Sequence, residues 1–386
     1  MRNPPASRVE IRKPAIARFI KRASGAWSAS TMAKGLTTAV VLGSSIVVAC
    51  ALSLLAITPR VVFWRDYPGT YEAVKVPAVL AQLRDPGGWD RALWIDPSFN
   101  AIQTLRWRLL PPVVGQLLHL PPRAYLGLPW LGLVALVGAC VHYLRDRLSV
   151  WVLLAAGVLA TTSSAFFCSS CFVGYFDPFY QLALVVFTFA PSPLLAAGAC
   201  ALGPWCDEKF LLMLPACACL RWVREPSWRS TVWPTLAILP YCAARLAALA
   251  AGDTSVSRQI AMQGAVFADY APALPLGWWY GFRLGWVAVG VGVAAAWRAL
   301  GWRAGSLMAA SLLAAVAAVS FLAWDTTRSI AMALPFLVAG AGERRLRPWL
   351  AWLAALNLLL PAAYVWCGHP VTVPLTSFLL TRQTRP

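Results

Sequence analysis

The sequence predicts an all-α fold, a polytopic transmembrane helical bundle with about eleven spans. Two observations lead to this fold class. Hydrophobic residues make up 59% of the 386 residues and charged residues only 12%, and the mean hydropathy is +0.64, far from the average of soluble domains. Apolar stretches of spanning length also recur from residue 36 to residue 366, so we expect burial in lipid to organise the chain.

Residues 1–35 form a basic segment that we expect to lie in the cytoplasm. They are too polar for a signal peptide, because they lack an early apolar core. The mixture of basic and apolar residues at 8–22 is typical of an interfacial helix on the inner leaflet, although Pro14 weakens that interpretation. A disordered basic tail is an equal alternative.

The first span is predicted at 36–60, and a long extracytoplasmic loop follows at 61–124. This loop is the largest segment outside the membrane. Its final part, NAIQTLRWRLLPPVVGQLLHL at 100–120, is predicted to form amphipathic helices along the outer surface, broken at Pro111 and Pro112.

Two further spans are predicted at 125–144 and 148–166, joined by the inner turn RDR. The loop after them contains Cys168 and Cys171 in the sequence CSSC, which allows a local disulfide or a redox motif. The remaining cysteines are scattered, and no other Cys/His cluster has the spacing of a zinc site.

Residues 178–222 contain apolar runs that are too short to cross a bilayer. Pro191-Ser192-Pro193 separates two of these runs, and the charged residues 207–209 separate the next two. We therefore predict an inner turn at the prolines, an outer turn at the charges and three short spans: 178–190, 194–206 and 209–222. Short, interrupted spans often line substrate sites.

One long span over 178–206 would conflict with the positive-inside rule. It would place three basic loops, at 221–229, 297–303 and 343–347, on the outer side, whereas Lys and Arg in short loops favour the cytoplasm. The remaining spans are predicted at 231–251, 276–297, 304–323, 328–342 and 348–366. This topology makes 36–366 one membrane domain and leaves an extracytoplasmic C-terminal tail at 367–386.

The net charge of +18 is explained by this topology rather than by binding to nucleic acid. Most of the excess of Lys and Arg falls on the predicted inner side, where anionic lipid attracts it. We therefore expect membrane lipid, and no nucleic acid, as a partner. The expected location is a bacterial inner (plasma) membrane.

Ionisable residues flanked by apolar sequence gather on the predicted outer side. Such residues are costly near hydrocarbon, so they indicate either function or mutual pairing. The candidates are Asp66, Arg106, Arg108, Asp177, Asp207, Glu208, Lys209, Asp325 and Arg328.

This set suits a sugar donor whose phosphate is linked to a lipid. Breaking the glycosidic bond needs a carboxylate that takes a proton from the acceptor hydroxyl, and Asp66 is the candidate catalytic base. Cations must stabilise the departing phosphate, and Lys209 with one or more of the arginines could bind it. The other acidic candidates could bind sugar hydroxyls or orient the cations.

Each candidate also has a purely structural interpretation. Lys209 could pair with Asp207 or Glu208. Asp177 could cap a helix whose first residue is Pro178. The others could face water, lipid head groups or one another.

The pattern resembles the GT-C superfamily of integral membrane glycosyltransferases, which use polyprenyl-phosphate-linked sugars. The shared features are a long first outer loop with surface helices, an acidic residue just after the first span, a basic residue at the outer turn of a short hairpin, and a later acidic–basic pair: Asp66, Lys209, Asp325 and Arg328. The sequence departs from many members in having Tyr67 after Asp66 and in lacking a large C-terminal outer domain.

The resemblance implies transfer from a polyprenyl-phosphate sugar donor to a glycan, lipid or protein acceptor. A divalent cation, Mg²⁺ or Mn²⁺, could bridge carboxylate and phosphate as a cofactor, but no ligand spacing requires one. The alternatives are a polysaccharide polymerase or ligase, which would use similar arginines, and a secondary transporter, which usually has repeated halves and charges at the midplane. A thiol oxidoreductase built on Cys168 and Cys171 would not need so many spans.

Overall fold

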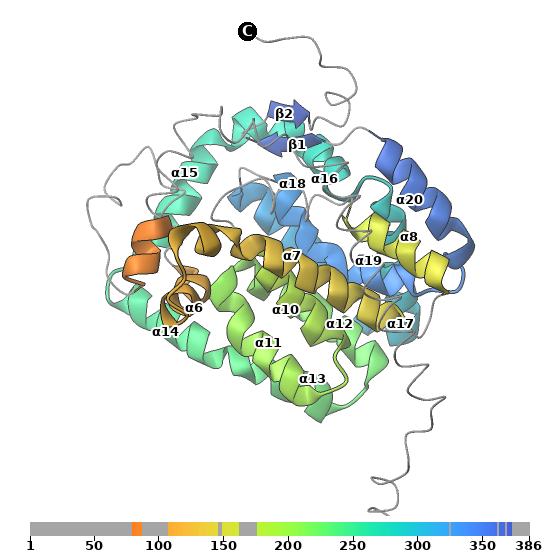
Figure 1. Ribbon diagram of the computed structural model, residues 1–386, viewed down its shortest axis with the longest axis horizontal. Coiled ribbons are helices and arrows are strands. Elements are labelled where there is room, and N and C mark those ends of the chain that lie inside the picture. The colour runs from red at the N-terminus through yellow and green to blue at the C-terminus, as the bar shows by residue number, and fades with distance from the viewer. Residues whose placement is uncertain are drawn as a thin grey trace, which may run out of the picture.

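The computed structural model describes residues 79–86, 107–145, 149–161, 176–323, 326–360, 363–366 and 369–372. Within these ranges the regular structure is helical apart from one two-stranded hairpin (Figure 1). Three helical segments are long and apolar enough to cross a membrane: Pro122–Leu144, Trp228–Ala250 and Gly285–Leu322. The all-α prediction is thus confirmed in this part of the chain, whereas the number of eleven spans is not. The first predicted span and the basic N-terminal segment lie outside the described residues.

Helices α6 (Leu110–Leu117) and α7 (Pro122–Leu144) begin the continuous part of the fold. Pro111 and Pro112 lie in the first turn of α6, where the missing N–H of proline breaks no helical hydrogen bond. The two prolines thus start a helix, and residues 100–106, where a helix before the break was predicted, lie outside the described residues. The 23 residues of α7 extend about 34 Å, enough to cross about 30 Å of hydrocarbon.

Three short helices form the predicted hairpin: α10 (Asp177–Phe189), α11 (Pro193–Cys206) and α12 (Lys209–Arg224). They contain 13, 14 and 16 residues and extend only about 20–24 Å. Their turns fall where the prolines and the charges predict them, and the Ser192 hydroxyl caps α11 by accepting from the Leu195 N–H at 3.4 Å. The largest buried cluster joins this hairpin to α7, α8 (Val150–Thr161) and the C-terminal helices.

Arg221 holds the end of α10 in place. Its guanidinium is 1% exposed and donates to the carbonyls of Phe187 at 2.6 Å and Ala190 at 2.8 Å. Its Nε donates to the carbonyl of Ser230 at 2.5 Å. One side chain thus satisfies carbonyls that the end of a helix leaves without partners and ties α12 to both α10 and α13.

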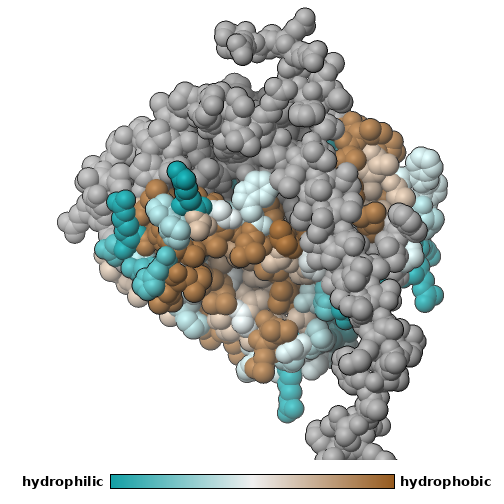
Figure 2. Space-filling model, in the orientation of Figure 1, coloured by the Kyte–Doolittle hydropathy of each residue, from teal (hydrophilic) through white to brown (hydrophobic). Residues whose placement is uncertain are grey.

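The segment formed by α13 (Trp228–Thr235), η2 (Leu236–Ile238) and α14 (Leu239–Ala250) exposes its apolar side chains. Only 11% of its most hydrophobic 18-residue stretch is buried. Leu194, Leu195 and Leu202 on α11 are also exposed. Brown, apolar residues cover much of the coloured part of the face shown in Figure 2, as expected of a surface that faces lipid rather than water.

Residues 252–275, for which the sequence predicts no element, contain helix α15 (Ser255–Tyr270) and the turn η3 (Ala271–Ala273). The span predicted at 276–297 differs from the structure, because helix α16 (Leu274–Phe282) ends at Arg283 and α17 (Gly285–Leu322) begins after it. Helix α17 breaks at Gly301, within the basic segment 297–303 that the sequence predicts between the spans 276–297 and 304–323. Gly301 has a φ of 74°, which glycine adopts without steric strain.

Helices α17 and α19 (Leu334–Ala341) cross at two glycines. A methyl group on Gly292 would collide with the Phe336 carbonyl, and one on Gly340 would collide with the Ala288 carbonyl. The absence of both side chains therefore lets the two backbones touch. Helix α18 (Thr326–Ser329) and η4 (Ile330–Ala333), which precede α19, are buried throughout.

The last predicted span, 348–366, is shorter than expected. Helix α20 (Leu350–Leu359) follows the turn η5 (Arg347–Trp349) and contains only 10 residues. Strands β1 (Ala363–Trp366) and β2 (His369–Thr372) then pair antiparallel, with Trp366 opposite His369. This β hairpin packs on α16 and α18 through β1. The Val365 N–H donates to the Thr327 hydroxyl at 2.9 Å.

Candidate functional site

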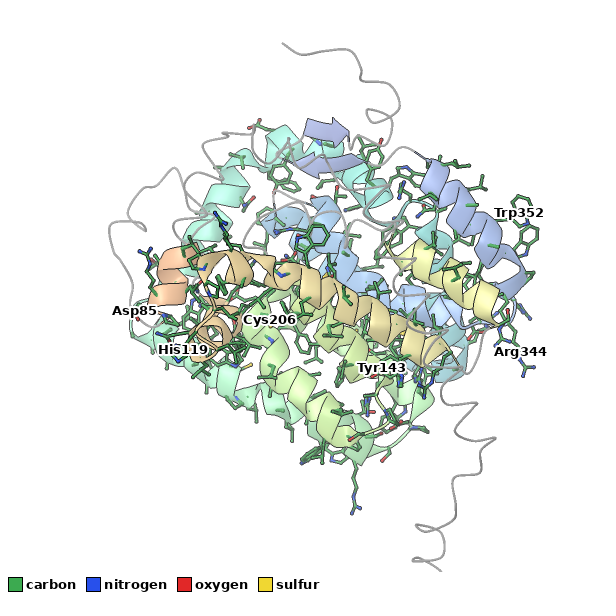
Figure 3. All side chains as sticks on the ribbon, in the orientation of Figure 1. Asp85, His119, Tyr143, Cys206, Arg344 and Trp352 are labelled. Carbon is green, nitrogen blue, oxygen red and sulfur yellow. The ribbon has the colours of Figure 1, made fainter. Side chains whose placement is uncertain are left out.

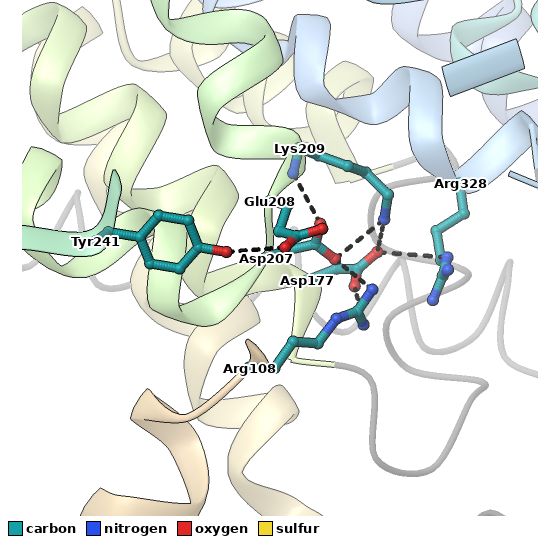
Figure 4. A network of polar contacts seen from close by, with 7 residues as sticks. All are labelled: Arg108, Asp177, Asp207, Glu208, Lys209, Tyr241 and Arg328. Carbon is teal, nitrogen blue, oxygen red and sulfur yellow. Dashed lines mark hydrogen bonds and ion pairs between the residues drawn. The ribbon is translucent and has the colours of Figure 1, made fainter. Parts of the chain in front are cut away.

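Five charged side chains meet at the end of the short hairpin where α10 begins and α11 ends (Figure 4). They come from helices α10, α12 and α18, from the turn between α11 and α12, and from the segment before α6, and all five residues are buried. We call this group the charge cluster, and its members are Arg108, Asp177, Asp207, Lys209 and Arg328.

Each carboxylate of the charge cluster is shared between cations. The Asp207 carboxylate lies 2.7 Å from the Arg108 guanidinium and 3.2 Å from the Lys209 ammonium. Asp177, which is fully buried, lies 3.5 Å from the Lys209 ammonium, 3.4 Å from Nε of Arg328 and 3.7 Å from Arg108. The two carboxylates therefore hold the three cations in one place.

Local backbone structure positions the two acids and the lysine. Asp177 lies in the first turn of α10, where a negative charge interacts favourably with the helix dipole. Asp207 has an extended backbone between α11 and α12, and its Oδ1 accepts from the Lys209 N–H at 2.9 Å. This bond caps the start of α12 and directs the other oxygen, Oδ2, toward the Lys209 ammonium.

The charge cluster contains three cations and two carboxylates. Removing charges from water is expensive, and pairing within a buried site offsets that cost only when the geometry is good. Guanidinium and ammonium groups are the usual ligands of phosphate. The chemistry of Lys209 and the two arginines therefore suits an anion that binds beside them.

A second polar group, which we call the Arg245 group, lies next to the charge cluster. The Arg245 guanidinium pairs with Glu208 at 3.1 Å and with Asp253 at 3.4 Å, and it lies 4.2 Å from the Trp107 ring centroid. Trp107 also donates to Asp253 at 3.1 Å, and the Tyr241 hydroxyl donates to Glu208 at 2.9 Å. Trp107 and Glu208 adjoin members of the charge cluster, so this group holds the backbone beside them.

The structure brings five of the nine predicted site residues into direct contact, and these are the members of the charge cluster. Glu208 instead contacts Tyr241 (Figure 4) and Arg245. The other three predicted residues, Asp66, Arg106 and Asp325, lie outside the described residues, as do Cys168 and Cys171.

The Arg245 group was not predicted from the sequence. Arg245 lies within a predicted span, and an arginine in such a segment is itself an indication of a buried partner. Its partners Trp107 and Asp253 are distant in sequence, and no local pattern connects them to it. Among the described residues, no group of three His, Cys, Asp or Glu side chains could hold a metal ion.

No family model, curated protein or solved structure matches this chain. The resemblance to the GT-C superfamily therefore depends on the sequence features alone. The role of the charge cluster has to be understood from its own chemistry.

Proposed function

We propose that this protein is an integral membrane glycosyltransferase. It transfers a sugar from a polyprenyl-phosphate donor to a glycan, lipid or protein acceptor at the extracytoplasmic face of a bacterial inner membrane. One observation carries the proposal, namely that Arg108, Lys209 and Arg328 converge on two carboxylates at one end of the short hairpin.

The charge cluster supports a phosphate-binding role. Its three cations come from elements that are distant in sequence. A single structural ion pair would need only one cation. Helices as short as α10 and α11 place their ends within reach of lipid head groups only if the bilayer thins or a polar site enters it. A lipid phosphate at this end would therefore meet cations that are already held in position.

The proposed reaction uses the cluster to stabilise the leaving group. Asp66 takes the proton of the acceptor hydroxyl as its oxygen attacks the anomeric carbon of the sugar. The bond between that carbon and the phosphate oxygen breaks, and polyprenyl phosphate leaves with the bonding electrons. Lys209 and the two arginines stabilise the charge that develops on the phosphate, while Asp177 and Asp207 orient them.

An assay of glycosyl transfer tests the proposal. Purified protein in liposomes is supplied with a panel of radiolabelled polyprenyl-phosphate sugars, and wild type is compared with Asp66→Asn and Lys209→Met. We expect each substitution to slow transfer by a factor on the order of 10² or more, because each removes a group that acts in the transition state. Arg344→Met is the matched control, since Arg344 is exposed. In Figure 3 it lies far from Cys206, the residue before Asp207 of the charge cluster.

The outcomes separate the proposal from its alternatives. Undiminished transfer in both variants would contradict the assigned site. Absence of transfer by wild type from every donor would contradict the function, and sugar uptake into the liposomes without transfer would indicate a transporter. Extension of a lipid-linked glycan by whole repeat units would indicate a polysaccharide polymerase.

A further inference from the structure

Three uncharged polar side chains are fully buried beside the charge cluster: Tyr180, Gln181 and Ser329. In the described part of the chain, the Tyr180 hydroxyl, both polar atoms of the Gln181 amide and the Ser329 hydroxyl have no hydrogen-bond partner. The charged groups around them do not supply one. We call these three residues the uncharged polar group.

The uncharged polar group lies on α10 and α18, the two helices that meet at the contact between Asp177 and Arg328. Tyr180 and Gln181 follow Asp177 by three and four residues on α10, so they share its face of the helix. The Tyr180 ring centroid lies 5.4 Å from the Lys209 ammonium. Ser329 follows Arg328, whose Nε contacts Asp177.

Such groups are unfavourable for folding. Each buried polar group without a partner costs about 1–3 kcal/mol, and replacing it with an apolar side chain of similar shape can remove that cost. Thr188 on the same helix shows how α10 satisfies a polar side chain, because its hydroxyl donates to the Leu184 carbonyl at 2.7 Å. Tyr180 and Gln181 lie close enough to interact with each other, but no hydrogen bond of good geometry satisfies the uncharged polar group, which indicates that a ligand completes it.

We infer that Tyr180, Gln181 and Ser329 form the subsite for the sugar of the lipid-linked donor, next to the phosphate. This inference rests on the proposed function and names the part of the site that selects the sugar. An amide and hydroxyls both donate and accept, as the hydroxyls of a sugar do, whereas an uncharged set offers no advantage to a second phosphate. Gln181 lies four residues after Asp177 on α10, about 6 Å along the helix axis, so a group bound at the charge cluster has a neighbour within reach of the amide.

Binding measurements test the subsite. The ligands are sugar-free polyprenyl phosphate, a panel of hexosyl and pentosyl polyprenyl phosphates, and the corresponding free methyl glycosides. The variants are Gln181→Met, which conserves volume, and Ser329→Ala, with Thr188→Val as a control whose hydroxyl is already satisfied within α10. We expect the first two to bind the preferred glycosylated lipid roughly three- to tenfold more weakly, with unchanged affinity for sugar-free lipid.

The different ligands distinguish failure of the subsite from failure of the proposed function. If both variants bind every glycosylated lipid as wild type does, the subsite is wrong, even when sugar-free lipid binds and the phosphate site stands. If wild type binds no polyprenyl phosphate at all, the proposed function fails. Binding of the free methyl glycosides then tests the subsite by itself. Stabilisation of wild type but not of Gln181→Met by a glycoside would then support the subsite, and stabilisation of neither would overturn it.

Discussion

The Arg108 guanidinium and the Asp207 carboxylate lie 2.7 Å apart and connect the segment before α6 to the turn between α11 and α12. Both residues are buried, so water cannot replace either partner. The contact fixes the position of a cation that sequence alone could have placed anywhere along the membrane surface. It is therefore the natural starting point for testing the charge cluster.

Asp207→Asn is expected to destabilise the protein by about 3 kcal/mol, because it leaves buried cations without one of their carboxylates. Thermal unfolding in detergent measures the loss. The double variant Arg108→Met/Asp207→Asn should lose less than the sum of the single changes, by about 1 kcal/mol or more. Additive losses would show that the two residues do not interact. Glu343→Gln, which alters a partly exposed carboxylate elsewhere, is the control.

Arg245→Met is expected to raise the KM for the donor by roughly three- to tenfold, because a small displacement of a binding group weakens a preorganised site. Arg245 contacts Trp107, which precedes Arg108 in the chain, but it does not contact the charge cluster itself. Steady-state kinetics over a range of donor concentrations measures the change, and Arg245→Lys should restore part of it. An unchanged KM with a lowered melting temperature would assign Arg245 a structural role only.

Arg221→Met is expected to lower the free energy of unfolding by about 3 kcal/mol while leaving the activity per folded molecule unchanged. The substitution removes donors from the buried carbonyls of Phe187 and Ala190, and buried acceptors without partners are costly. Melting temperature and specific activity are measured on the same preparation. Arg229→Met, at an exposed position on α13, should change neither value.

Gly340→Ala is expected to destabilise the protein by at least about 1–3 kcal/mol, because the added methyl group would force α17 and α19 apart. The collision involves the backbone carbonyl of Ala288, which cannot rotate away as a side chain could. Gly290→Ala on α17 is a matched control, since a methyl group there meets nothing within 4 Å, and it should be neutral or slightly stabilising. Equal melting temperatures for the two variants would contradict the close crossing.

The short hairpin could be predicted because its turns are marked by residues with strong local effects. Pro191 and Pro193 stop helices, and a run of three charges is expelled from hydrocarbon. The break at Gly301 was also predictable, because it falls in the basic segment 297–303 between two predicted spans. The break at Arg283 carries no comparable mark, since apolar sequence continues on both sides of it. Hydropathy reports how apolar a window is and not where its backbone turns, so it also missed α15 and the β hairpin.

The sequence by itself determined that this chain is rich in apolar helices and that costly charges stand at the ends of short ones. Only the tertiary structure decided which of those charges meet. Asp207, Glu208 and Lys209 are consecutive, yet Asp207 and Lys209 join the charge cluster while Glu208 contacts Arg245. The backbone changes from extended at Asp207 to helical at Lys209, which turns successive side chains in different directions. Their partners, Arg108 and Arg328, are brought to them by helix packing, which depends on contacts between distant residues and leaves no local pattern in the sequence.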